Sequence, residues 1–388
     1  MPKLDKDVFL IAALRTPIGK FGGALASMTA PQLGVASAKA TIERSGIDPA
    51  KIDEVIFGNA RQAGVGPNAA RQIAIKSGLR HEVPAYTVNQ ACGSGLRAIM
   101  NASDQIRLGH AEVVLAGGTE SMSNTPYLLP RVRWGTRMGD QELVDGMYRD
   151  GFMCPLADEM MGATAETLAD RYKIPRKEQD EFALESQKKA ERAYAENRFA
   201  DEIVPLEKLQ RDEHPRFDTD LGSLAKLPPV FRKDGSVHTG NSSGVTDGAS
   251  SMLVASGEAV KKHGLKPMAR IVGYSQAGVD PKIMGVGPVP ATQRLLREVG
   301  IPLSGIDLIE LNEAFAAQVL ACDRELHFDR AKLNVHGGAI ALGHPIGCTG
   351  ARITTTLLHA LRTHDKSVGL ATLCISGGMG LSMIVERV

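Results

Sequence analysis

The stretch GIDPAKID at residues 46–53 is matched by GIPLSGID at residues 300–307, and a strand-like apolar run follows each copy at once. Corresponding residues of the two stretches are 254 positions apart. Later in each half a glycine-rich turn leads into a helix pattern, with ACGSGL at 91–96 and GHPIGCTG at 343–350. Another apolar strand and a further glycine turn complete each half. Matches at three places in the same order favour duplication of one unit over chance similarity.

Short apolar runs alternate with helix-like stretches along the chain. Examples are Val55–Phe57, Val113–Ala116, Leu308–Leu311 and Val368–Ala371. This alternation predicts an α/β layered fold with buried strands. We expect the two halves to be α/β units packed about a pseudo-twofold axis, with corresponding loops meeting.

A stretch of different character separates the halves. We assign residues 1–118 and 250–268 to the N-terminal half, 119–249 to an inserted substrate-side lobe, and 269–388 to the C-terminal half. A charged helix is predicted over 175–197 in the insert. Its apolar side consists of Phe182, Ala183, Ala190, Ala193 and Tyr194.

Bulk properties exclude several functions. The formal net charge is +1, so no general field would hold nucleic acid or an anionic membrane, and neither is expected as a partner. No segment approaches ~20 uninterrupted apolar residues, the length that a membrane span needs. The N-terminal MPKLDKDVFLIAALRTP has no apolar run long enough for a signal peptide, and its residues 8–14 predict a first strand. Five scattered cysteines indicate reduced thiols in a cytoplasmic protein.

Cys92 is the first candidate for chemistry. A strand-like approach precedes it, and small residues followed by an apolar helix pattern come after it. Such a turn places the thiol near a helix N-terminus, where free N–H groups and the helix dipole stabilise a thiolate and lower its pKa. The alternative is a small buried cysteine beside a tight turn.

His344 occupies about the place in the second half that Cys92 occupies in the first. A histidine flanked by glycine and proline is poorly explained as core packing, and a neutral imidazole there could take the thiol proton. The alternatives are a structural histidine and a zinc site with Cys348. Zinc lacks a credible third and fourth ligand, so no metal is expected.

Two further positions complete the set. Cys374 lies at a strand end entering a glycine turn, and a second thiol near the first can act as general acid and base. A redox pair with Cys92 is the alternative, although nothing resembles Cys-x-x-Cys. Asn312, which follows the apolar run 308–311, could hold a water or a substrate oxygen.

Together these motifs resemble those of the thiolase family over essentially the whole chain. The matching segments are RTPIGKFGG at 15–23, NQACGSG at 89–95, AGGTESM at 116–122, GNSSG at 240–244, DGA at 247–249, MG at 284–285, GP at 287–288, NEAF at 312–315, residues 337–347 and the turn that begins at Cys374.

The resemblance implies a five-layered α-β-α-β-α fold of two βαβαβαββ halves plus a loop domain. It implies an acyltransferase that performs reversible, ping-pong thiolysis of a 3-ketoacyl-CoA, including acetoacetyl-CoA. CoA and acetyl-CoA are then substrates, and no cofactor is held permanently. A homo-oligomer is expected, a dimer or a tetramer, because the segment 131–140 resembles a tetramerisation loop.

By the same match, Cys92 becomes acylated and Cys374 handles the α-proton. His344 activates Cys92 and, with a water held by Asn312, forms one oxyanion site. The backbone N–H groups of Cys92 and Ser376 form the second.

The resemblance also places the residues that contact CoA and substrate. Arg216, Ser223 and Phe231 are expected along the nucleotide and pantetheine path, Ser243 at a pantetheine amide, and Met161 and Met284 around the acyl end. Phe315 is expected among the residues that bind substrate or CoA. Gap-filling in a core is the alternative for each methionine.

Two departures bear on these expectations. Ser376 stands where the family usually has glycine, which is tolerated only if the position does not need a positive φ. Met160 stands where short-chain biosynthetic members tend to carry histidine, and methionine resembles the degradative members. The rival functions are a ketoacyl-synthase-type condensing enzyme acting on acyl carrier protein and an inactive lipid-binding protein on the same fold.

Overall fold

The computed structural model describes residues 6–388. The prediction that the N-terminal stretch is not a signal peptide also covers residues 1–5, which lie outside the described residues. Strand β1, Val8–Arg15, confirms the first strand predicted for residues 8–14. Among the described residues no helix is both long enough and apolar enough to cross a membrane.

The N-terminal half has the expected order βαβαβαββ. Each apolar run named above forms a strand in the structure. The elements are β1, α1 (Ala30–Ser45), β3 (Glu54–Gly58), α2 (Ala69–Lys76), β4 (Ala85–Val88), α3 (Ser94–Arg107), β5 (Val113–Ser121) and β10 (Thr246–Ser256), with the short β2 (Gly19–Lys20) beside β10 and α7 (Gly257–His263) after it.

The C-terminal half repeats this order with one reduction. Its third strand shrinks to a single parallel bridge between Ile309 and Leu333. The elements are β11 (Pro267–Gly278), α8 (Pro288–Val299), β12 (Leu308–Leu311), α9 (Ala316–Leu326), α10 (Ala339–Leu342), α11 (Ile346–Thr363), β13 (Val368–Ile375) and β14 (Met379–Arg387).

Strand pairing shows the pseudo-twofold relation between the halves. One sheet runs in the order β12-β13-β14-β11-β1-β10-β5-β3-β4. The antiparallel pair of β1 and β11 lies at its centre, with Leu10 opposite Ala269. Outward from that pair each half has two antiparallel contacts and then a parallel one, β5 with β3 and β13 with β12.

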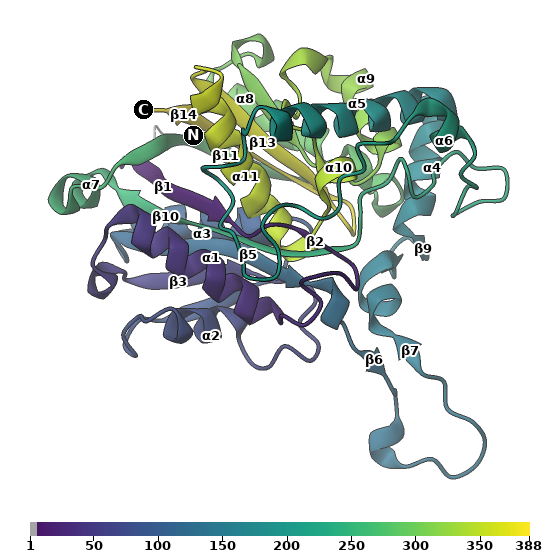
Figure 1. The fold of residues 1–388 in the computed structure, drawn as a ribbon, viewed down its shortest axis with the longest axis horizontal. Helices are drawn as coiled ribbons and strands as arrows, with labels where there is room; N and C mark the ends of the chain where they lie inside the picture. Colours follow the sequence, from purple (N-terminus) through teal and green to yellow (C-terminus); the bar gives the residue numbers. More distant parts are fainter. Residues whose placement is uncertain (1–5) are drawn as a thin grey trace.

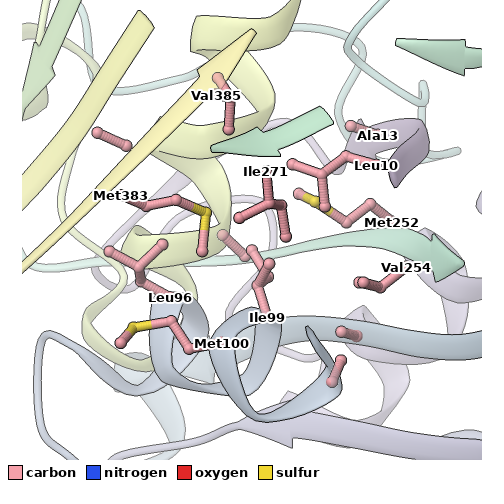
Figure 2. Packing of buried hydrophobic residues seen from close by; sticks show 14 of the residues in the cluster. Leu10, Ala13, Leu96, Ile99, Met100, Met252, Val254, Ile271, Met383 and Val385 are labelled. Carbon is pink, nitrogen blue, oxygen red and sulfur yellow. The ribbon is translucent and has the colours of Figure 1, made fainter. Parts of the chain in front are cut away.

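Three apolar cores lie between the layers. α3 and α11 pack on each other and on strands of both halves, and Figure 2 shows Leu96 and Ile99 of α3 meeting Met252 of β10 and Met383 of β14. A second core lies under α1 and α2, and a third under α8 and α9. The molecule therefore has the five α-β-α-β-α layers expected (Figure 1).

The duplicated stretches do the same structural work in both halves. Gly46 and Gly300 end α1 and α8 with left-handed φ values of 69° and 71°, which glycine adopts without steric cost. The Asp53 carboxylate accepts bonds of 2.8 and 2.9 Å from two consecutive backbone N–H groups at the start of β5. Asp307 does the same at the start of β13, at 3.0 and 2.9 Å. Each aspartate thus joins the strand that follows it to its parallel neighbour.

The insert contributes small strands and three helices. α5 confirms the predicted charged helix, since Phe182, Ala183, Ala190 and Ala193 are buried. Figure 1 shows β6 and β7 at the base of an arm that projects from the body. The division at residues 118, 249 and 268 stays a prediction. The elements are β6 (Tyr127–Leu128), β7 (Val144–Asp145), β8 (Met153–Cys154), β9 (Glu159–Met160), α4 (Met161–Arg171), α5 (Arg176–Ala195) and α6 (Leu221–Ala225).

Candidate active site

The two central helices bring two reactive side chains together. Cys92 lies two residues before α3, and His344 lies two residues before α11. The helices approach closely at glycines of their first turns. A Cβ on Gly95 would lie 2.6 Å from a backbone nitrogen of α11, and a Cβ on Gly350 would come closer still to backbone of α3. Only glycine allows this approach, which places both helix N-termini beside one cavity.

The turn that carries Cys92 is held in an uncommon conformation. Ala91 has a φ of 45°, in the left-handed region that residues with a side chain rarely adopt. The Ser94 hydroxyl accepts a 2.9 Å bond from the Gln90 N–H and donates a 2.7 Å bond to the Ala91 carbonyl. These bonds offset the backbone strain and direct the thiol toward the second half.

His344 is buried and its two ring nitrogens have different partners. Nε2 lies 3.3 Å from the Cys92 Sγ, and Nδ1 lies 2.6 Å from the Thr349 hydroxyl. That hydroxyl donates to the Pro345 carbonyl at 2.9 Å, so it accepts the proton of Nδ1. Nε2 therefore carries the lone pair and can take the Cys92 proton. The predicted pair is in place, with its tautomer determined by a threonine.

Burial governs the protonation of this pair. It lowers the pKa of His344 to about 3, and the charges of Arg352 and Arg61 act in the same direction. Burial also raises the pKa of Cys92, against the smaller effects of Arg61 and of the Ser376 and Cys92 N–H groups. The expectation that the helix N-terminus lowers the Cys92 pKa is therefore wrong in net direction. The resting pair is a neutral thiol and a neutral imidazole.

Cys374 lies at the end of β13 and lines the same cavity as Cys92 and His344. It is buried among Met161, Met284 and other apolar side chains. Burial, and then the charge of Cys92, raises the pKa of Cys374 well above its ordinary value. A thiol with a raised pKa keeps its proton until a strong base needs it.

Ser376 begins the turn between β13 and β14. Positive φ values occur at the next two residues, Gly377 and Gly378, at 86° and 85°, and not at Ser376. The serine is therefore tolerated at this position. Its backbone N–H lowers the pKa of Cys92, as an N–H directed at the sulfur does.

Asn312 approaches the pair from β12. Its Nδ2 lies 3.5 Å from the His344 Nε2, and among the described residues its buried Oδ1 has no hydrogen-bond partner. A buried amide oxygen of this kind is ready to bind a water or a substrate group.

The structure divides the expected substrate residues between two places. Met161, Ser243, Met284 and Phe315 line the cavity with the two cysteines. Arg216 and Ser223 line a separate groove together with Thr239 and Gly240, only a few residues before Ser243 in the chain. Phe231 lines neither; it packs edge-on against Phe315, with ring centroids 6.2 Å apart. Met160 is not among the lining residues of this cavity, whereas its neighbour Met161 is.

Two residues of the site escaped the sequence reasoning: Thr349, which contacts His344, and Arg61, which lines the cavity. Thr349 stands one helical turn after Pro345, and a threonine in the first turn of a helix that follows a reactive histidine is the signal for it. Arg61 comes just after the buried strand β3, and a charged residue at that edge is the corresponding signal. Among the described residues no cluster of three possible metal ligands exists.

Comparison with known proteins agrees with this geometry. The thiolase N-terminal domain model matches residues 8–258, and the thiolase C-terminal domain model matches residues 265–387. The chain is 51% identical to an acetyl-CoA acetyltransferase of Pseudomonas aeruginosa, with 98% of this chain and 100% of the relative covered. An Escherichia coli acetyl-CoA acetyltransferase is 49% identical, with 98% and 99% covered. The structure of human mitochondrial 3-ketoacyl-CoA thiolase in complex with CoA is 45% identical, with 100% of this chain and 99% of that chain covered and a TM-score of 0.97. This chain belongs to the thiolase family.

Proposed function

We propose that the protein cleaves 3-ketoacyl-CoA, including acetoacetyl-CoA, with CoA by a reversible ping-pong reaction through an acyl-Cys92 intermediate. The protein is an acyltransferase of the thiolase family. The observation that carries the proposal is the 3.3 Å contact between the Cys92 Sγ and the lone-pair nitrogen of His344, inside a cavity that a second thiol also lines.

The first half-reaction uses the neutral pair. As the Cys92 sulfur attacks the 3-keto carbon, its proton moves to the His344 Nε2. The bond between C2 and C3 then breaks, which leaves the acyl group on Cys92 and acetyl-CoA as its enolate. Cys374 donates its proton to C2 of that enolate. Its raised pKa suits this role because the thiol stays protonated until the carbanion forms.

The second half-reaction reverses the proton movements. The Cys374 thiolate takes the proton of the incoming CoA thiol, and the CoA sulfur attacks the acyl-Cys92 carbonyl. The shortened acyl-CoA leaves as the Cys92 sulfur recovers its proton from His344. The acyl-Cys92 intermediate and the acyl-CoA product are both thioesters, so the acyl transfer of the second half-reaction is nearly balanced. Each proton transfer is reversible, so the cycle can also run toward condensation.

Two groups of donors are proposed for the developing oxyanions. The backbone N–H groups of Cys92 and Ser376 would stabilise the oxygen on the acylated carbon. Protonated His344, with a water on Asn312, would stabilise the thioester enolate oxygen. Preorganised donors of this kind typically supply about 3 kcal/mol each in a site that excludes water.

CoA is proposed as a co-substrate that enters from the insert, and no cofactor is proposed to be held permanently. Arg216 and Ser223 would contact the nucleotide end in their groove, while Ser243 would meet a pantetheine amide at the mouth of the cavity. The His214 ring packs directly on Gly244, where a side chain would collide with it, and so joins the two places.

A homotetramer in the cytoplasm is the proposed form of the protein. The arm between β6 and β7 exposes Trp134 and Met138 by 86% and 91%, and large apolar side chains in such a position are typical of an interface. The five cysteines are free thiols, as in a reducing compartment. Light scattering of the wild type and of a Trp134→Asp variant tests the assembly; an unchanged mass in the variant would contradict the role of the arm.

Thiolysis of acetoacetyl-CoA by added CoA tests the activity itself. The enolate absorbance of acetoacetyl-CoA should fall only when both CoA and enzyme are present. A condensing enzyme that needs acyl carrier protein would leave this absorbance unchanged, and so would an inactive lipid-binding protein. A folded sample that fails to consume acetoacetyl-CoA therefore refutes the proposal.

A further inference from the structure

Arg61 is a buried cation with no carboxylate hydrogen-bonded to its guanidinium among the described residues. Its side chain is 7% exposed and lines the cavity that contains Cys92, and its Nε has no hydrogen-bond partner among the described residues. No carboxylate lies within ion-pair distance of its guanidinium in the described part of the chain. Burying a guanidinium whose N–H groups have no acceptor is costly, so an arginine in this state points to a ligand that supplies the missing acceptor.

Burial raises the pKa of the Glu120 carboxylate and the charge of Arg61 acts to lower it, but the hydrogen bonds of this carboxylate go to other groups. Glu120 accepts bonds from the Asn59 side chain and from the backbone N–H groups of residues 60, 61 and 347. These bonds keep the carboxylate turned to the backbone and leave the guanidinium of Arg61 free to face the cavity.

Backbone packing fixes the guanidinium in place. A Cβ on Gly151 would lie 2.6 Å from the Arg61 Nη2, so the guanidinium packs against this glycine. Its charge also reaches the reacting groups, since it lowers the pKa of both Cys92 and His344. An immobile planar fork with free N–H groups matches the two oxygens of a carboxylate.

Arg61 follows Ala60, which belongs to an apolar cluster beside Cys92. Cys374 belongs to another apolar cluster of the same cavity, with Met161 and Met284. The cluster beside Cys92 is formed by Ala60, Met122, Met147 and Ile346 with Phe152. An acyl group bound to Cys92 would extend along the cluster that contains Ala60, toward the guanidinium.

We infer that this thiolase selects 3-ketoacyl-CoA substrates whose acyl chain ends in a carboxylate, and that Arg61 binds that carboxylate as an ion pair. The inference rests on the proposed thiolytic function and adds a substrate class to it. It makes Arg61 a residue that determines specificity and leaves the chemical steps to the other groups of the cavity.

The test compares matched substrates in the full-length enzyme. 3-Oxohexanoyl-CoA is compared with the CoA monothioester of 3-oxohexanedioic acid, joined at C1 so that C6 is the free carboxylate, and the pairs one and two carbons longer are treated alike. At one chain length or more the wild type should show the higher kcat/KM for the carboxylate substrate. Arg61→Leu should lower the ratio of the two kcat/KM values by about 10²-fold, the size expected for losing charge-assisted bonds. Arg61→Lys, which keeps the charge without the planar fork, should lower the ratio less.

Arg149→Leu is the matched control, because it removes the same charge from an exposed side chain of the neighbouring segment and should leave the ratio at the wild-type value. Thermal unfolding checks that Arg61→Leu folds, and Arg61→Gln replaces it if it does not. A wild type that cleaves the neutral substrate at least as well at every length overturns the inference. So does a variant that slows both substrates equally, because Arg61 would then only tune the Cys92 thiol. Failure of the wild type to cleave either kind of substrate at any length refutes the thiolytic function instead.

Discussion

Thr349→Val tests the claim that one hydroxyl determines which nitrogen of His344 takes the Cys92 proton. Valine has nearly the shape of threonine and removes the hydroxyl, which lies 2.6 Å from Nδ1 and also donates to the Pro345 carbonyl. The Nδ1 proton then has no partner, which costs about 1–3 kcal/mol for a buried donor. The ring can recover part of that cost only by moving its proton to Nε2, where it blocks transfer from Cys92.

The expected effect on catalysis follows from that cost. If the productive tautomer is less favoured by about 1.4–2.8 kcal/mol, acylation of Cys92 should slow by about 10- to 100-fold. Rapid-mixing measurements of acyl-enzyme formation from acetoacetyl-CoA give the rate directly. Thr349→Ser keeps the hydroxyl and should restore most of it.

Thr354→Val is the matched control. Thr354 is buried in the same helix and donates a 2.9 Å bond to the carbonyl four residues before it, as Thr349 does, but it contacts no histidine. Both variants should lose about 1 kcal/mol of stability for that bond. The reasoning is refuted if Thr349→Val acylates as fast as Thr354→Val.

Further variants test the remaining roles. Cys92→Ser should abolish acyl-enzyme formation, seen as the loss of the acyl mass increment in intact-protein spectra, because a weak buried base cannot activate a hydroxyl; undiminished turnover would contradict the assignment. Cys374→Ala should stop exchange of the acetyl-CoA α-protons with deuterated solvent while slow acylation of Cys92 continues. Exchange at the wild-type rate would show that Cys374 is not the general acid and base. Burial lowers the pKa of His344 to about 3 and raises the pKa of Cys92, so the rate at which iodoacetamide alkylates Cys92 should rise only above pH 9. A step in that rate near pH 6.5 would instead indicate that the His344 ring is protonated at lower pH. Gly350→Ala should destabilise the fold by about 1–3 kcal/mol through its collision with α3, whereas Gly278→Ala should not, because its Cβ would meet only one backbone oxygen at an ordinary 3.8 Å.

Much of the fold could be predicted because the duplicated signals are local. Gly46 and Gly300 end helices through their own backbone conformation, and Asp53 and Asp307 hold the start of the next strand. Glycine turns before a helix pattern likewise predicted where Cys92 and His344 lie. The reduction of the third strand of the C-terminal half was not predictable. All that remains of this strand is the bridge between Leu333 and Ile309, which depends on a contact between segments distant in the chain.

Energies that depend on distant segments also escaped prediction. Proximity to a helix N-terminus suggested a low pKa for Cys92, but the insert and the second half bury the thiol, and burial dominates. The difference between Met160 and Met161 depends on which of two neighbours faces the cavity, which the sequence alone does not state. The sequence could not predict the role of Arg61 either, because that role depends on the lack of hydrogen-bond acceptors around its guanidinium.

Equivalent positions of the two repeats hold unlike residues, a sulfur before one central helix and an imidazole before the other. A perfectly symmetric ancestor would have presented two thiols or two rings to each other, with no donor–acceptor difference between them. The reaction therefore requires that the copies ceased to be interchangeable, and exchanging the two residues by double mutation would move the nucleophile to the opposite side of the cavity. The two halves of the fold are related by pseudo-twofold symmetry, while the proton transfer between them runs from the thiol of one half to the imidazole of the other.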